Sequence, residues 1–313
     1  MTDPVILFFL FGLVCGLLKI DLKLPKGFYP FLSAYLLLSI GLKGGLELRH
    51  VNLQSFGPQA IAVILMGVFI TVFSFPILKG WGRFDRDNAA SIAAHYGSVS
   101  VGTFAAGIAF LQQKNISFES YVPLFVVLLE VPAIIVGIVL AKGVNARDQL
   151  KPLLREVFFG KSIVLLVGGL VIGAISGEEN FQGASFLFFD LFKGALALFL
   201  LEMGQVTADR ASSLKKSGAF LIGFAVIMPL FGASLGGLLG VSLGLSVGGA
   251  TILAILAASS SYIAVPAAMS ISLPKANQSL SLGASLGVTF PFNVTIGIPL
   301  YYYFVKMIDS YLN

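Results

Sequence analysis

The sequence predicts an all-α integral membrane protein with ten transmembrane helices, arranged as two inverted repeats of five. The first observation is composition: 57% of the 313 residues are hydrophobic and 11% are charged, whereas soluble domains carry about 25% charge. The second is a set of apolar segments near the ~20 residues that a bilayer requires. The third is a pair of polar interruptions at matching places in the two halves of the chain.

Ten apolar segments are candidate spans. In chain order they are 4–19, 29–46, 55–79, 88–111, 119–142, 155–176, 184–205, 217–241, 246–272 and 279–306. The first is short and the last is long, so we expect tilt or partial burial at both ends of the set. An even number of spans places both termini on the same side of the membrane.

The basic residues predict the orientation, because cytoplasmic loops carry an excess of Lys and Arg. Fifteen of the 20 fall on one side, namely Lys19, Lys23, Lys26, Lys79, Arg83, Arg86, Lys142, Arg147, Lys151, Arg155, Lys161, Arg210, Lys215, Lys216 and Lys275. We therefore expect a multi-pass protein of the inner (plasma) membrane, in contact with lipid, with both termini outside. The net charge of +5 lies in these loops, so no nucleic-acid partner is expected.

The two halves, 1–149 and 150–313, align as a duplication. A shift of 163 positions places Gly41 on Gly204, Ser98 on Ser261 and Glu130 on Asn293. Five spans is an odd number, so the second copy would enter the membrane from the opposite side. Inverted repeats of this kind are typical of secondary transporters.

The first interruption lies in the segment 88–111, where Gly97, Ser98, Ser100 and Thr103 follow His95. Small and hydroxyl residues often mark a close crossing of two helices. For this segment alone, such a packing role is the favoured interpretation. Two roles remain equally possible for His95: it could carry a proton, or it could be a neutral histidine that is hydrogen-bonded to another helix.

The second interruption lies in the segment 246–272, where Ser259, Ser260, Ser261 and Tyr262 precede Pro266. Proline lacks an N–H, so the carbonyl four residues earlier loses its helical partner. A loosened backbone at membrane depth is tolerated only where protein buries it or where it lines a wet cavity. Freed N–H groups suit an anion, and freed carbonyls and hydroxyls suit sodium. Two such breaks predict a binding site for a small solute.

Glu130 is a carboxylate in the middle of a span, and such a costly group is expected to have a functional role. The alternative role is a structural pair with a lysine or a hydroxyl. Its counterpart in the alignment, Asn293, also offers an oxygen. With Ser261 and Thr289, these two residues make up the predicted ion-coupling set.

Five motifs carry a resemblance to the sodium-dependent bicarbonate transporters of cyanobacteria, the SbtA type. They are Ile40–Gly45 with Arg49 and Asn52, Tyr96–Ser100 with Thr103, Glu130–Ala133, Ala257–Ser261 with Pro266, and Leu282–Ser285. The resemblance implies two crossing broken helices in a core domain that moves against a gate domain, each domain built from both repeats. It also implies a homotrimer and inhibition by a small PII-like protein on the cytoplasmic face. Ser98 and Thr103 fall on the family's first substrate motif, and Ser259, Ser260 and Ser261 on the second.

The chain departs from the family pattern at several positions. The family has an aspartate where this chain has Tyr262, a glycine at Val265, a second proline at Ala267 and Gly-Ser at Val101-Gly102. Glu130 stands where the family has an aspartate, and the long loop between the halves is missing. Loss of the acid at Tyr262 removes an expected sodium ligand. Its phenol could instead donate to an anion or fill space.

These observations predict a secondary transporter for sodium-dependent uptake of bicarbonate or a similar small anion, with Gly97, Ser100 and Tyr262 also in the substrate site. Sodium is the coupling ion, and no other cofactor or enzymatic activity is expected. A cation/proton antiporter or an organic-anion symporter of the same fold is the alternative, with Glu130 and His95 as proton carriers. Gly-Ala-Ser-Leu-Gly occurs at 232–236 and at 283–287, which suggests an intramembrane serine protease as a further alternative. The rhomboid pattern requires glycine after the serine, and neither copy has it, so this alternative is disfavoured.

Overall fold

A computed structural model describes residues 4–20, 22, 25, 27–48, 56–143, 155, 159–214 and 218–312. Within these ranges every regular element is a helix. Arg49, Asn52 and most of the loop that joins the two halves lie outside the described residues. So do six of the basic residues that are predicted to face the cytoplasm: Lys23, Lys26, Arg147, Lys151, Lys215 and Lys216.

The described part of the first half contains six helices. They are α1 (Pro4–Leu17), α2 (Phe28–Leu48), α3 (Phe56–Gly80), α4 (Arg86–Gly97), α5 (Val101–Gln113) and α6 (Leu124–Lys142). The predicted segment 88–111 is thus two helices, α4 and α5, and the break lies where the polar residues predicted it. The segment predicted to begin at 119 begins as a helix only at Leu124, after a series of turns.

The second half contains α8 (Lys161–Ser185), α9 (Phe192–Leu214), α10 (Ala219–Ser242), α11 (Val247–Ala257), α12 (Ala264–Ser272), α13 (Gln278–Ala284), α14 (Phe290–Phe292) and α15 (Ile298–Leu312). Three π-helical turns join neighbouring helices, η2 (Phe186–Asp190), η3 (Ser285–Thr289) and η4 (Asn293–Gly297). The predicted end of a span at 176 coincides with a break in α8. Gly177 has non-helical backbone angles, with φ at +71°, and a second helical stretch continues from there to Ser185.

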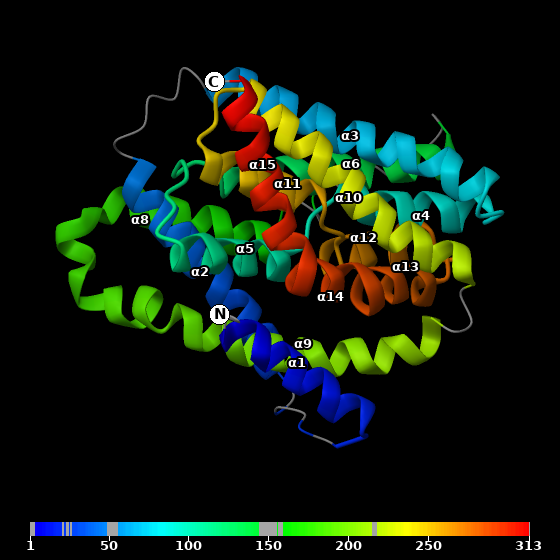
Figure 1. The fold of residues 1–313 in the computed structure, drawn as a ribbon, viewed down its shortest axis with the longest axis horizontal. Coiled ribbons are helices and arrows are strands. Elements are labelled where there is room, and N and C mark those ends of the chain that lie inside the picture. The colour runs from blue at the N-terminus through cyan, green and yellow to red at the C-terminus, as the bar shows by residue number, and fades with distance from the viewer. Residues whose placement is uncertain are drawn as a thin grey trace.

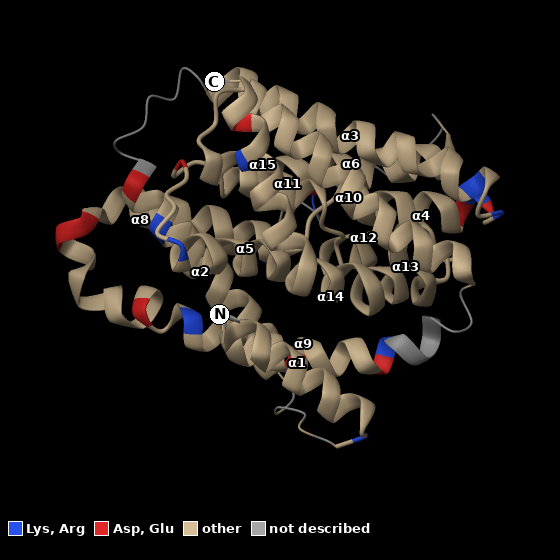
Figure 2. Ribbon diagram, viewed as in Figure 1, with Lys and Arg blue, Asp and Glu red and all other residues tan. Residues whose placement is uncertain are grey.

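Among the residues that the structure describes, five helical segments are long and apolar enough to cross a membrane, judged by length and composition. They are Phe56–Gly80, Leu124–Lys142, Lys161–Arg210, Ala219–Ser242 and Gln278–Leu312. Shorter apolar helices occur at Pro4–Leu17 and Val247–Ala257. In Figure 2 most of the Lys, Arg, Asp and Glu residues lie at helix ends and loops, toward the left and right margins of the view. The count of ten spans stays a prediction.

Two helices of the first half each pack along a helix of the second half: α1 packs along α9, and α2 packs along α8 (Figure 1). Glycines allow both approaches. A Cβ on Gly12 would lie 2.0 Å from the carbonyl oxygen of Leu201, and one on Gly41 would lie 2.4 Å from that of Leu166. Reciprocal pairing of this kind is expected if the second half repeats the first, and the repeat itself stays a prediction.

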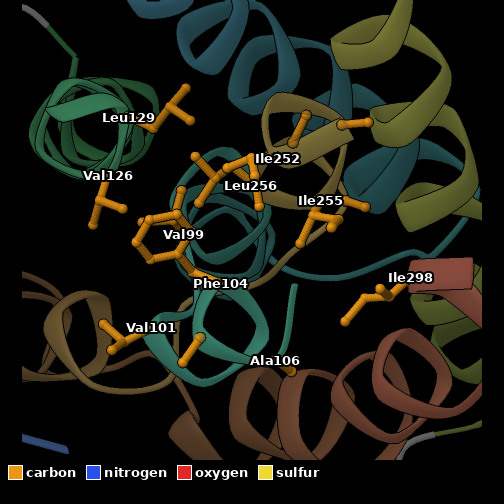
Figure 3. Close-up of a cluster of buried hydrophobic side chains, with 14 of the residues drawn as sticks. Val99, Val101, Phe104, Ala106, Val126, Leu129, Ile252, Ile255, Leu256 and Ile298 are labelled. Carbon is orange, nitrogen blue, oxygen red and sulfur yellow. The ribbon is translucent and has the colours of Figure 1, made fainter. Parts of the chain in front are cut away.

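The centre of the molecule is formed by α4, α5 and α11, which are buried along most of their length. Helices α3, α6, α10 and α15 pack around them. In the close-up of Figure 3, Val99, Val101 and Phe104 lie beside side chains from α6 and α11, among them Leu129 and Leu256. This apolar packing surrounds the two interruptions and fixes where they meet.

Candidate functional site

The first interruption is a three-residue stretch between Gly97 and Val101. Ser98 and Ser100 adopt extended backbone conformations there. The Ser100 hydroxyl caps α5, because it accepts hydrogen bonds from the backbone N–H of Thr103 at 3.1 Å and from the Thr103 hydroxyl at 2.8 Å. A serine in this position satisfies one of the free N–H groups of a helix start. The polar residues therefore build the start of a new helix.

The second interruption runs from Ala258 to Ile263, between α11 and α12. The Ser259 hydroxyl donates to the carbonyl of Leu256 at 2.8 Å, and the Ser261 hydroxyl accepts from the N–H of Val265 at 3.3 Å. Pro266 lies in the first turn of α12, where its missing N–H costs no intrahelical bond. The break therefore lies upstream of the proline, over the three serines and Tyr262.

The two interruptions lie in contact and exchange backbone hydrogen bonds. The N–H of Ser100 donates to the Ser259 hydroxyl at 2.9 Å, and the N–H of Gly102 donates to the Tyr262 hydroxyl at 3.2 Å. In the other direction, the N–H of Ser261 donates to the carbonyl of His95 at 2.8 Å. Each break therefore satisfies backbone groups that the other leaves free.

Gly97 and Gly102 are the two glycines that this contact requires. A Cβ on Gly102 would lie 2.4 Å from the Tyr262 hydroxyl and 2.7 Å from the Phe199 ring. A Cβ on Gly97 would lie 1.8 Å from the hydroxyl oxygen of Thr71 on α3. The predicted packing role of these glycines and the predicted site thus coincide, because close packing brings the polar groups together.

The segment η3–α14–η4 holds both interruptions from one side. Ser260 and Ser285 share a hydroxyl–hydroxyl hydrogen bond of 2.6 Å. The Asn293 amide donates to the carbonyl of Ala258 at 2.9 Å. The Thr289 hydroxyl donates to the carbonyl of Ala225 at 2.7 Å, and its oxygen lies 2.8 Å from the Tyr96 hydroxyl. Thr289 and Asn293 are therefore joined to the breaks through bonds that position them.

Seven buried side-chain N or O atoms have no hydrogen-bond partner among the described residues, and three of them are predicted functional groups: Ser98 Oγ, His95 Nε2 and Glu130 Oε2. His95 Nδ1 lies 2.7 Å from the carbonyl of Ser91 on the same helix. Nδ1 therefore carries the proton in the neutral ring, and Nε2 presents a lone pair. Buried polar groups are normally bonded, so these three atoms mark places where a ligand, an ion or water completes the structure.

The part of α6 that carries Leu129 and Glu130 packs near the end of α4 through Leu129. A Cβ on Gly67 of α3 would lie 2.8 Å from the Leu129 side chain and 3.2 Å from the carbonyl of Gly97. The α6 backbone next to Glu130 and the end of α4 thus meet around one glycine. Glu130 is buried, 3% exposed.

Three residues of the site were not predicted: Tyr96, Ser285 and Tyr301. The Tyr301 hydroxyl donates to Asn293 Oδ1 at 2.7 Å. A signal existed, because Ser281, Ser285, Thr289, Asn293 and Tyr301 recur at multiples of four. A π turn holds more residues than the 3.6 of an α turn, so η3 and η4 keep this repeat facing the breaks.

Comparison with known proteins adds one finding. A search of curated proteins gives no match. The family model of the Na⁺-dependent bicarbonate transporter superfamily matches residues 4–306, which is nearly the whole chain and includes both interruptions. This is a family of transporters and not of enzymes, and its members are multi-pass membrane proteins. The chain belongs to the Na⁺-dependent bicarbonate transporter superfamily.

Proposed function

We propose that the protein carries out sodium-dependent uptake of bicarbonate, or of a similar small anion, by alternating access around the two interruptions. The observation that carries the proposal is the contact between two broken helices at a buried position. Helices broken at membrane depth typically bind substrate and coupling ions in secondary transporters.

The anion would bind at the start of α5. The N–H groups of Ser100 and Gly102 point at hydroxyl oxygens of Ser259 and Tyr262, and these oxygens stand where the oxygens of an oxyanion would sit. A helix N-terminus favours negative charge. In this view Gly97, Ser98, Thr103, Ser260 and Ser261 shape the remainder of the site.

Sodium would bind close to the first interruption. Ser98 Oγ and Glu130 Oε2 have no hydrogen-bond partner among the described residues, and both are oxygens, which sodium prefers as ligands. An anion that enters an inside-negative cell moves uphill by about 2.3 kcal/mol per 100 mV. Co-transported sodium would offset this cost. Ser261, Thr289 and Asn293 would position the ligands from the opposite side.

The test is bicarbonate flux into proteoliposomes with and without a sodium gradient. We expect flux that depends on sodium and that falls in Ser98→Ala. This variant removes no hydrogen bond to a described residue, so it should unfold like the wild type. Ser242→Ala is the matched control, because the Ser242 hydroxyl is exposed and bonds only to the carbonyl of Leu239. Absence of sodium-dependent flux would refute the proposal.

One observation favours a second candidate, a cation/proton antiporter or organic-anion symporter. The two unpartnered atoms His95 Nε2 and Glu130 Oε2 can both take up a proton. Proton coupling predicts flux that is indifferent to sodium and is abolished when the pH gradient is dissipated. Sodium coupling predicts the reverse.

We extend three properties of the resemblance to this chain as proposals: a homotrimer, a PII-like cytoplasmic regulator, and insertion in the inner membrane with both termini outside. The two inverted repeats, 1–149 and 150–313, belong to the same proposal. Native mass spectrometry in detergent tests the trimer. Accessibility of tags at the two termini to an impermeant protease in intact cells tests the orientation.

A further inference from the structure

The first turn of α11 is bonded to a glutamate from the loop that follows α5. The N–H of Ser246 donates to Glu119 Oε1 at 2.6 Å, and the Ser246 hydroxyl donates to Glu119 Oε2 at 3.2 Å. The same hydroxyl accepts from the N–H of Gly249 at 3.1 Å. A carboxylate at the start of a helix is favoured by the helix macrodipole. Glu119 therefore caps α11 from a different part of the chain.

Two glycines in this turn allow the loop to lie directly against the helix. A Cβ on Gly248 would lie 2.0 Å from the carbonyl oxygen of Ser117, and one on Gly249 would lie 1.9 Å from Glu119 Oε2. The loop and the start of α11 are thus in backbone contact. We call this contact, with its two hydrogen bonds to Ser246, the Glu119 anchor.

The loop is itself fixed at its beginning by Lys114, which follows the last residue of α5. The Lys114 N–H donates to the carbonyl of Leu111 in α5 at 3.1 Å. Its ammonium group lies 5.3–5.8 Å from the centres of three aromatic rings, one on α5 and two on α15, and such contacts are attractive: Phe110, Tyr302 and Tyr303. The Glu119 anchor therefore connects α11 to a loop that α5 and α15 hold in place.

The face of α11 that packs on α10 offers little resistance to a shift along the helix axis. Gly232, Gly236 and Gly240 recur every four residues on α10. A Cβ on any of them would lie 2.1–2.7 Å from an atom of α11. Side-chain ridges that fit into grooves normally fix how one helix sits along another, and glycines supply no ridge. Contacts at the two ends of α11 gain importance for that reason.

The other end of α11 leads into the second interruption. There the carbonyl of Ala258 accepts from the Asn293 amide at 2.9 Å, and the Ser259 hydroxyl accepts from the N–H of Ser100 at 2.9 Å. The 11 residues of α11 span about 16 Å at 1.5 Å per residue. A hydrogen-bonded helix of this length transmits a shift of its first turn to its last, and so to the serines.

We propose that Glu119 is a positioning residue of the transport site. By anchoring the first turn of α11, it sets where Ser259–Tyr262 meet the start of α5. Glu119 acts through α11 and lies outside both interruptions. Its effect on bicarbonate rests on the proposed function, whereas its effect on the geometry of the interruptions does not.

Two variants weaken the anchor to different degrees. Glu119→Gln keeps the size of the side chain and removes its charge. Ser246→Ala removes the hydroxyl and leaves the bond between Glu119 and the Ser246 N–H, so it remains informative if Glu119→Gln does not fold. Glu179→Gln is the matched control, because Glu179 is an exposed glutamate of α8. On the predicted topology Glu119 and Glu179 both face the outside.

Amide hydrogen–deuterium exchange in nanodiscs, resolved by mass spectrometry, reports on the far end of α11 without any need for transport. Peptides that cover 98–102 and 258–263 include the N–H groups of Ser100, Gly102 and Ser261, which are bonded between the interruptions. We expect Glu119→Gln to speed exchange there about two- to fivefold, the range that the charge of one helix cap supports. Ser246→Ala should give a smaller rise, and Glu179→Gln none. Exchange that is faster only in the first turn of α11, or nowhere, would overturn the inference.

Bicarbonate flux supplies the second measurement. A displaced site should raise KM about two- to fivefold in Glu119→Gln. A cap with only a structural role would lower the amount of folded protein, and with it the maximal rate, but would leave KM unchanged. Loss of a negative charge from the outer face would by itself attract the anion and lower KM, and Glu179→Gln measures that effect. A KM that stays constant or falls in Glu119→Gln would therefore overturn the inference.

The two measurements separate this inference from the proposed function. Faster exchange at the interruptions, in a protein without sodium-dependent flux, would support the Glu119 anchor and refute only the proposed function. Sodium-dependent flux together with exchange that is the same in Glu119→Gln and the wild type would overturn the positioning role of Glu119 alone.

Discussion

Asn293 allows a sharp test, because it joins the second interruption to the C-terminal helix through both atoms of its amide. It is fully buried, with Nδ2 bonded to the carbonyl of Ala258 at 2.9 Å and Oδ1 bonded to the Tyr301 hydroxyl at 2.7 Å. Asn293→Leu keeps the approximate volume and leaves both partners unpaired. At about 1–3 kcal/mol for each unpaired buried group, the free energy of unfolding should fall by about 2–6 kcal/mol.

The same reasoning predicts a smaller effect for Tyr301→Phe. This variant removes one of the two bonds and leaves Oδ1 without its donor, so the expected loss is about 1–3 kcal/mol. Unfolding in mixed micelles with increasing SDS, followed by far-ultraviolet circular dichroism, measures both variants and their double mutant. The double mutant should cost less than the sum, because both single variants lose the same bond.

We call the two hydrogen bonds of Asn293, to Ala258 and to Tyr301, the Asn293 clamp. A loss of unfolding free energy below about 0.5 kcal/mol for Asn293→Leu, the range of ordinary surface substitutions, would refute this clamp. The sodium dependence of flux decides whether Asn293 has an additional role in ion coupling. A clamp alone predicts that Tyr301→Phe and Asn293→Asp leave the half-saturating sodium concentration unchanged. A sodium ligand predicts a shift for Asn293→Asp only.

Three further predictions concern the interruptions. Gly97→Ala places a Cβ 1.8 Å from the Thr71 hydroxyl, so overpacking should cost about 1–3 kcal/mol or more; Gly168→Ala, which meets nothing within 4 Å, is the control, and equal thermal midpoints would contradict the close contact. Tyr262→Phe removes the acceptor of the Gly102 N–H, so the free energy of unfolding should fall by about 1–3 kcal/mol. The KM for bicarbonate should also fall, because the freed N–H becomes available to the anion. A raised KM would mean that the phenol itself binds substrate. Ser260→Ala and Ser285→Ala lose the same hydrogen bond, so a double-mutant cycle on the free energy of unfolding should give a coupling of about 0.5–1.5 kcal/mol. Strict additivity of the two variants would exclude the bond. Unchanged flux in Ser260→Ala would limit the bond to a structural role.

The positions of the two interruptions could be predicted because their cause is local. Hydroxyl residues, glycines and a proline within apolar segments indicate where a helix ends, and α4, α5, α11 and α12 end and begin there. The role of Pro266 could not be predicted as accurately. The sequence indicated that the proline itself breaks the helix. In the structure the serines before it form the break, and Pro266 lies in the first turn of the next helix.

The arrangement around the interruptions could not be predicted, because it depends on residues that are far apart in the chain. The bond between Ser260 and Ser285, and that between Tyr96 and Thr289, require the π turns η3 and η4, which residue propensities do not reveal. The alignment paired Glu130 with Asn293 as equivalent. Their surroundings differ, because the Asn293 amide is bonded at both atoms and Glu130 Oε2 has no partner among the described residues.

The exchange of partners between α1 and α9, and between α2 and α8, has a consequence for biosynthesis. About 200 residues separate the end of α1 at Leu17 from the end of α9 at Leu214. At ~5–20 residues per second, the ribosome needs on the order of 10–40 s to supply that partner. During this interval the glycine-lined face of α1 has only lipid or the insertion machinery to contact. Neither half of the chain can complete its own packing, so the two halves should be stable in the membrane only when they are made together.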